Sequence, residues 1–182
     1  LRGLMENHGL APEEFLDYVH DIDVSPVPPN PALNDVLHRI DGRKVIFTNG
    51  SVTHAENVLG RLGITHHFDG IFDIIAADYV PKPERSAYEA FVREHNVDPT
   101  RAVMLEDIAR NLEPAHAMGM TTVWVRSDHE HSAMGANGDH VHYAIDDLVE
   151  WDVIDMRGRG VAIDDAAADV DLVVIATPDA VV

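Results

Sequence analysis

The sequence feature that most constrains the fold is an alternation of short apolar segments with amphipathic segments between residues 44 and 145. The apolar segments are typical of buried strands, and the segments between them have helical spacing with capping residues at their ends. Together they predict a Rossmann-like, three-layer α/β fold with helices on both faces of a parallel sheet. The predicted strands are 44–48, 71–76, 101–105, 121–125 and 140–145, and the predicted helices between them are 53–61, 84–95 and 109–118.

Different patterns flank this region. Residues 1–20 have the spacing of two short helices, and a proline-rich linker leads to a helix with Asn30 as N-cap and Pro31 at its first position. After residue 154, an arginine- and glycine-containing linker precedes the apolar stretch 171–177, which we predict to be a strand. The predicted divisions are therefore 1–24, 25–154 for the α/β core, and 155–182 for a linker and an extra strand of unknown role.

Composition excludes several classes of partner. The formal net charge of −19 disfavours nucleic acid and acidic membranes. No apolar run is long enough to span a membrane, no signal peptide opens the chain, and cysteine is absent. We therefore expect a reducing, cytoplasmic location, and the sequence leaves the oligomeric state unknown. Because the first residue is Leu1, we expect that the natural start has been lost.

Polar groups follow the predicted strands in a set order. Thr48, Asn49 and Gly50 follow the first strand, where a hydroxyl and turning backbone amides suit a phosphoryl oxygen, although an ordinary strand-to-helix turn uses the same residues. Lys82 stands between two prolines where a helix begins. The helix dipole disfavours a cation there, so its placement favours a function in offsetting negative charge.

An acidic pair follows the strand 101–105. Glu106 and Asp107 would repel each other at the end of a buried strand unless a cation lay beside them, and Asn111 follows on the next helix. Oxygen ligands of this kind suit Mg²⁺, whereas helix-capping acids are the simpler alternative. The order hydroxyl, lysine and acidic pair is much more specific than any one of these features.

With these contexts, residues 31–150 resemble the haloacid dehalogenase superfamily of hydrolases. Phe47-Thr48-Asn49-Gly50, Pro81-Lys82-Pro83 and the segment 106–112 look most like its bacterial pyrimidine 5′-nucleotidases. The more general pattern has Ser or Thr after the acidic pair, where this chain has Ile108. The resemblance makes residues 1–24 the end of a helical cap. It implies a Mg²⁺-dependent phosphomonoester hydrolase acting through an aspartyl-phosphate on a nucleoside monophosphate.

The resemblance also implies roles for these residues. Thr48, Asn49 and Gly50 would bind the phosphate, and Lys82 would balance the charge of phosphate and nucleophile. Asp107 would ligate Mg²⁺, with Glu106 supporting it and Asn111 in an outer position. A sugar-phosphate or phosphoglycolate phosphatase, a mutase and a non-catalytic fragment remain alternatives. A dehalogenase is disfavoured because it needs no Mg²⁺, and a receiver domain is disfavoured because its acidic pair comes first in the chain.

The nucleophile that this family requires, in an apolar strand ending Asp-x-Asp-x-Thr, is not evident. Asp21 and Asp23 have the right spacing, but a predicted amphipathic helix precedes them instead of a strand. We therefore expect the nucleophile and its central strand before Leu1, which would leave this fragment inactive. The tail strand 171–177 is a less favoured candidate for the vacant central position. The histidines near 129–131 and 140–142 are predicted to lie in an exposed, glycine-rich loop rather than a metal site.

Overall fold

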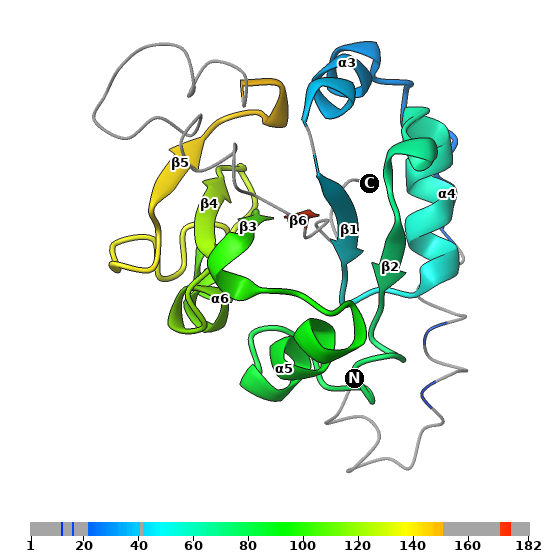
Figure 1. Cartoon of the computed structure of the whole chain (residues 1–182). Helices are drawn as coiled ribbons and strands as arrows, with labels where there is room; N and C mark the ends of the chain where they lie inside the picture. The colour runs from blue at the N-terminus through cyan, green and yellow to red at the C-terminus, as the bar shows by residue number, and fades with distance from the viewer. Residues whose placement is uncertain (1–11, 13–15, 17–21, 41, 151–171, 176–182) are drawn as a thin grey trace.

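The computed structural model describes residues 12, 16, 22–40, 42–150 and 172–175 (Figure 1). The predicted helices in 1–20, the helical cap and the linker after residue 154 therefore lie almost entirely outside the described residues. Among the described helices, none combines the length and the apolar character needed to cross a membrane.

The described residues form one six-stranded sheet with the order β2-β1-β6-β3-β4-β5, in which every neighbouring pair is parallel. This confirms the predicted parallel α/β architecture. The strands are β1 (Arg43–Phe47), β2 (Gly70–Phe72), β3 (Ala102–Glu106), β4 (Thr121–Val125), β5 (Tyr143–Ile145) and β6 (Leu172–Ile175). The helices are α3 (Pro31–Arg39), α4 (Val52–Leu62), α5 (Arg85–Glu94) and α6 (Glu113–Ala117).

Alternating side chains of the central strands build a separate core on each face of the sheet. Ile46 of β1 and the neighbouring Val103 and Leu105 of β3 pack with apolar residues of α3 and α4. Because side chains of a strand alternate between faces, the other residues of the same strands meet α5 and α6 instead. Among the described residues, the result is three layers, with two α-helices against each face of the sheet.

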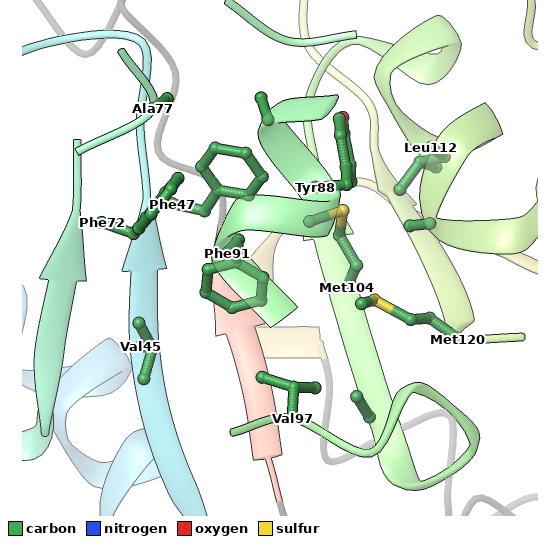
Figure 2. Close-up of a cluster of buried hydrophobic side chains, with 13 residues drawn as sticks. Val45, Phe47, Phe72, Ala77, Tyr88, Phe91, Val97, Met104, Leu112 and Met120 are labelled. Atoms are coloured by element: carbon green, nitrogen blue, oxygen red, sulfur yellow. The ribbon is translucent and has the colours of Figure 1, made fainter. Parts of the chain in front are cut away.

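The second core contains four aromatic side chains among its thirteen buried residues (Figure 2). Phe47 of β1 stacks on Phe91 of α5, with ring centroids 5.1 Å apart and planes 10° apart. Phe72 and Tyr88 meet Phe47 edge-on, at 5.2 and 5.1 Å. All four side chains are at most 1% exposed, so this cluster fixes the end of β1 against α5.

The residues that cap α3 and α4 are only partly those that the local sequence predicts. Asn30 caps α3 as predicted, because its Oδ1 accepts the N–H of Leu33 at 3.0 Å. Thr53 and Glu56 have the spacing of a capping box, but Ser51 is the N-cap of α4 and accepts from the N–H of His54 at 3.3 Å. Gly63 ends α4 at a positive φ of 79°, as its sequence position predicted.

Two predicted elements are shorter than expected. The strand predicted for 71–76 ends at Phe72, because Asp73 accepts the backbone N–H groups of Ile75 and Ala76 and turns the chain. The helix predicted for 109–118 is divided into one 3₁₀ turn, Ala109–Leu112, followed by α6. Pro114 has no N–H to donate to the preceding turn, which accounts for the interruption.

The central position of the sheet is occupied by β6, from the end of the chain (Figure 1). Val174 pairs with Val45 of β1 on one side and with Met104 of β3 on the other. The expected gap at the centre is therefore absent, and the less favoured candidate, the tail strand, fills it. A continuous sheet pairs the facing backbone groups of β1 and β3, which would otherwise be buried without partners.

Candidate active site

The predicted functional residues gather at one edge of the sheet. Thr48 follows β1 directly, and Glu106 and Asp107 lie at the end of β3. β1 and β3 lie on either side of β6. From β1 the chain continues to β2, toward one edge of the sheet, whereas from β3 it continues to β4, toward the other edge. In open parallel sheets ligands bind at such a point, outside the carboxyl ends of the strands.

The turn after β1 presents one hydroxyl and several backbone amides. Thr48 is 3% exposed, and its Oγ1 accepts the N–H of Gly50 at 2.9 Å. Because that oxygen serves as an acceptor, the hydroxyl proton is directed elsewhere and can be donated to a ligand. Asn49 Oδ1 accepts the backbone N–H of Lys82 at 2.8 Å, so this turn also fixes the lysine segment.

Lys82 forms a buried ion pair inside the site. Its Nζ donates to Glu106 Oε2 at 2.7 Å and to the carbonyl of Phe47 at 3.1 Å. The two charged side chains are only 3% and 1% exposed. The sequence placed Lys82 at a strand end, but it follows β2 only after a long turn, and its position is set by Asn49 and Glu106.

Both carboxylate oxygens of Glu106 are engaged. Oε2 receives the Lys82 ammonium, while Oε1 accepts from the N–H of Ile108 and from Asn111 Nδ2, each at 3.2 Å. Tyr88 in turn donates its hydroxyl to the carbonyl of Asn111. Glu106 therefore holds Lys82, Ile108 and Asn111 in place.

Asp107 differs from Glu106 because one of its carboxylate oxygens is not engaged. Its side chain is buried, and Oδ1 has no hydrogen-bond partner. Burial, together with the hydrogen bond and negative charge of Glu106, raises the pKa of Asp107 to about 7. A buried, unpartnered carboxylate oxygen suits a divalent cation. The described residues contain no group of three or more acidic or histidine side chains able to hold a metal, so further ligands would come from elsewhere.

The main chain of Asp107 is held by two residues that the sequence did not indicate. Its carbonyl accepts from Ser132 Oγ at 2.7 Å and from Trp124 Nε1 at 3.0 Å. Ser132 lies in the glycine-rich loop after β4, where a serine is an ordinary surface residue. No sequence signal indicated that its side chain would be fully buried.

A pocket of about 270 Å³ lies beside these groups, and of the residues expected from the sequence Asn49, Lys82 and Asn111 line it. Arg110, His131 and Met134 line it in addition to the residues expected from the sequence. The 129–131 segment is exposed, as predicted, but its last histidine borders the site. The full lining consists of Asn49, Lys82, Pro83, Ile108, Arg110, Asn111, His131 and Met134.

The structure does not bring Asp23 to this edge. Asp23 is exposed and accepts the N–H of Ser25 at 2.9 Å, and hydrogen bonding by Ser25 lowers the pKa of Asp23. The carbonyl of Ser25 in turn accepts from Arg61 at the end of α4. Since α4 begins beside the site and runs away from it, Asp23 lies toward the opposite edge of the sheet. Asp21 lies outside the described residues.

Comparison with known proteins agrees with this arrangement. Residues 6–119 match the haloacid dehalogenase-like hydrolase family. The chain therefore belongs to that family, and its fold is the one that the resemblance implied.

Individual relatives differ in their activities. The chain is 32% identical over 126 residues to the fructose-1-phosphate phosphatase YqaB of Escherichia coli (strain K12), a match covering 67% of this chain and 64% of the relative. It is 37% identical over 130 residues to the enolase-phosphatase E1 of Frankia alni, covering 69% and 50%. A (S)-2-haloacid dehalogenase of Pseudomonas sp. (strain CBS-3) is 31% identical over 106 residues, covering 57% and 45%.

Among solved structures, a HAD phosphatase from Thermococcus onnurineus superimposes with a TM-score of 0.55 at 26% identity. The match covers 84% of this chain and 67% of that one. The chain thus spans between about half and two thirds of the length of the two phosphatase relatives and of this solved structure.

Proposed function

We propose that this chain provides the phosphate- and Mg²⁺-binding part of a phosphomonoester hydrolase that acts through an aspartyl-phosphate. The observation that carries the proposal is the unpartnered, buried Oδ1 of Asp107 at the same edge as Thr48 and Lys82. Phosphoryl transfer uses three groups of these kinds: a carboxylate that binds a cation, a hydroxyl with a proton to donate, and an ammonium held in place.

Each residue then has a defined part. Thr48 donates its hydroxyl and Asn49 its backbone N–H to phosphoryl oxygens, while Gly50 holds the turn through its hydrogen bond to Thr48. Lys82 offsets the charge of the phosphate and of an attacking carboxylate. Asp107 would ligate Mg²⁺, supported by Glu106 and Asn111, and the ion would neutralise charge on the phosphoryl oxygens.

Neither acidic side chain at the site is available as the attacking carboxylate. Glu106 is paired with Lys82, and Asp107 is the candidate metal ligand. We propose that an Asp-x-Asp segment before Leu1 supplies the nucleophile and the acid–base group. The 182-residue chain alone would then bind ligands without turning them over.

For the substrate we infer a small phosphorylated metabolite, with a nucleoside monophosphate favoured by the residues around Thr48, Lys82 and Asp107. The match to fructose-1-phosphate phosphatase favours a sugar phosphate as the second candidate. A panel of pyrimidine and purine monophosphates, fructose 1-phosphate and phosphoglycolate, assayed by phosphate release from an N-terminally extended form, tests this. A kcat/KM highest for a sugar phosphate would reject the nucleotide assignment.

The activity itself is tested with p-nitrophenyl phosphate and Mg²⁺. We expect no hydrolysis by the 182-residue chain, hydrolysis by the extended form, and no chloride release from an (S)-2-chloro acid by either. Hydrolysis by the short chain that is lost in Asp21→Asn would contradict this assignment and make Asp21 the nucleophile. Chloride release would instead identify a dehalogenase, like the Pseudomonas relative.

A further inference from the structure

Asp107 is oriented from outside its own strand. Ser132 Oγ and Trp124 Nε1 both donate to its carbonyl oxygen, at 2.7 and 3.0 Å. The Ser132 side chain is completely buried. One oxygen of the Asp107 carboxylate, Oδ1, has no hydrogen-bond partner, so the backbone that carries the side chain contributes to its direction.

Ser132 is the centre of a small hydrogen-bond network. Its Oγ accepts the N–H of Ser127 at 3.2 Å and is 3.3 Å from Trp124 Nε1. Its carbonyl accepts the N–H of Ala109, two residues beyond Asp107, at 3.0 Å. One buried serine therefore connects the loop 127–135, β4 and the two consecutive peptides that follow Asp107.

A second contact joins the same loop to the same turn. Gly135 has a φ of +84° and packs on the backbone of Arg110, where a Cβ would lie 3.2 Å from the Arg110 Cα. This contact is independent of the hydrogen bonds of Ser132. The loop 127–135 is therefore attached to the segment 107–110 at two places.

We propose that Ser132 is a positioning residue for Asp107 and that, with Trp124, it sets the affinity of this site for a divalent cation. The inference rests on the proposed function, in which Asp107 is the Mg²⁺ ligand. Ile108 lacks the hydroxyl that the general pattern of the family has next to the acidic pair. Ser132 supplies a hydroxyl to the same peptide from a distant part of the chain.

The test is Mg²⁺ binding by isothermal titration calorimetry to the 182-residue chain and to Ser132→Ala. Loss of an outer hydrogen-bond partner of a ligand commonly weakens metal binding about 10- to 100-fold, so we expect a weakening of at least about tenfold. Ser127→Ala is the matched control. It removes a hydroxyl from the same loop, but that side chain is exposed and accepts one long bond, 3.4 Å, from His129.

A purely structural role is distinguished by a second ligand. Inorganic phosphate, titrated without Mg²⁺, would be held by Thr48 and Lys82, so its affinity should be unchanged in Ser132→Ala. Trp124→Phe, which removes the other donor, should also weaken Mg²⁺ binding, and the double variant should be less than additive because both residues hold one carbonyl. If Ser132→Ala does not fold, the Mg²⁺ titration of Trp124→Phe alone tests the proposal.

The outcomes separate the two proposals. A wild-type chain that binds no Mg²⁺ would overturn the proposed function and this inference with it. Mg²⁺ binding by wild type that is equal in Ser132→Ala and Ser127→Ala would overturn the inference alone. Equal weakening of Mg²⁺ and phosphate binding in Ser132→Ala would also overturn it, because it would indicate general loosening of the site.

Discussion

Lys82 and Glu106 form a pair whose two members depend strongly on each other. Replacing Lys82 by Met leaves the Glu106 carboxylate buried, with its strongest partner removed. Breaking a buried pair in this way commonly costs about 3–5 kcal/mol. We therefore expect Lys82→Met to lower the free energy of unfolding by that amount in urea denaturation.

The control is an exposed pair of the same kind. Arg85 and Glu89 lie one helical turn apart on α5, with side chains 69% and 50% exposed. Arg85→Met should cost less than about 1 kcal/mol. The double variant Lys82→Met, Glu106→Gln should recover part of the loss. Equal effects at the two pairs would show that Lys82 contributes no more than a surface cation.

Asp107 gives the metal-free chain a specific pH dependence. Its pKa is about 7 in the folded state, whereas the ordinary value for an aspartate is 3.8, so the folded state retains a proton that the unfolded state releases. The stability contributed by this group is therefore present below about pH 4 and falls as the pH rises to about 7. Above that pH an ionised carboxylate is buried without a cation.

Asp107→Asn removes this dependence. We expect it to stabilise the metal-free chain more at pH 8 than at pH 5, by at most about 3 kcal/mol, because part of the interval between the two pKa values lies below pH 5. Comparing the variant with wild type at each pH cancels contributions from other acidic residues. The same substitution should abolish stabilisation by Mg²⁺ at pH 8. Parallel pH profiles for the two proteins in thermal denaturation would contradict the assignment.

At the scale of elements, the loop 127–135 is a fixed part of the site. Gly135→Ala introduces a Cβ at a positive φ and against the Arg110 backbone, so we expect a loss of about 2 kcal/mol or more. Gly63→Ala shares the positive φ, of 79°, but meets open space and should cost only about 1 kcal/mol.

Gly60 completes this comparison, because it lies inside α4 and a Cβ added there would have nothing within 4 Å. Gly60→Ala should stabilise the chain by up to about 1 kcal/mol, since alanine favours a helix interior. The three variants are compared by chemical denaturation. The order Gly60, Gly63, Gly135 from most to least stable is expected, and Gly135→Ala as mild as Gly63→Ala would show that the loop moves away freely.

For the whole molecule, β6 determines whether the sheet is continuous. Its backbone pairs with β1 and β3 on both sides, so the amides of Val173–Ile175 should exchange with solvent as slowly as those of Ile46 and Met104. Hydrogen exchange followed by NMR measures this directly, with the exposed segment 128–130 as the fast reference. Fast exchange at Val173–Ile175 would exclude a central, paired strand.

The same position is the one that the resemblance assigns to the nucleophile strand. In an N-terminally extended form two strands would compete for one place between β1 and β3. We expect Val173–Ile175 to lose protection in that form while Ile46 and Met104 keep theirs. Retained protection would mean that the nucleophile is supplied by a segment outside the central position.

The sequence alone determined the class of the fold and the main binding groups. Alternating apolar and amphipathic segments are short-range patterns, so β1, β4, α3 and α5 could be predicted nearly to their ends. Thr48, Asn49, Lys82, Glu106 and Asp107 were identified because their order along the chain follows the order of strand ends. Parallel strands bring those ends to one edge.

Only the tertiary structure decided what surrounds these groups. The central position of β6, the burial of Ser132 and the unpartnered oxygen of Asp107 depend on contacts between segments far apart in the chain. Local propensity carries no information about such pairings, because a strand's partner and a serine's burial are set by packing of the whole molecule. The residues proposed to bind phosphate could therefore be predicted from the sequence, while Ser132, proposed to orient the cation ligand, could not.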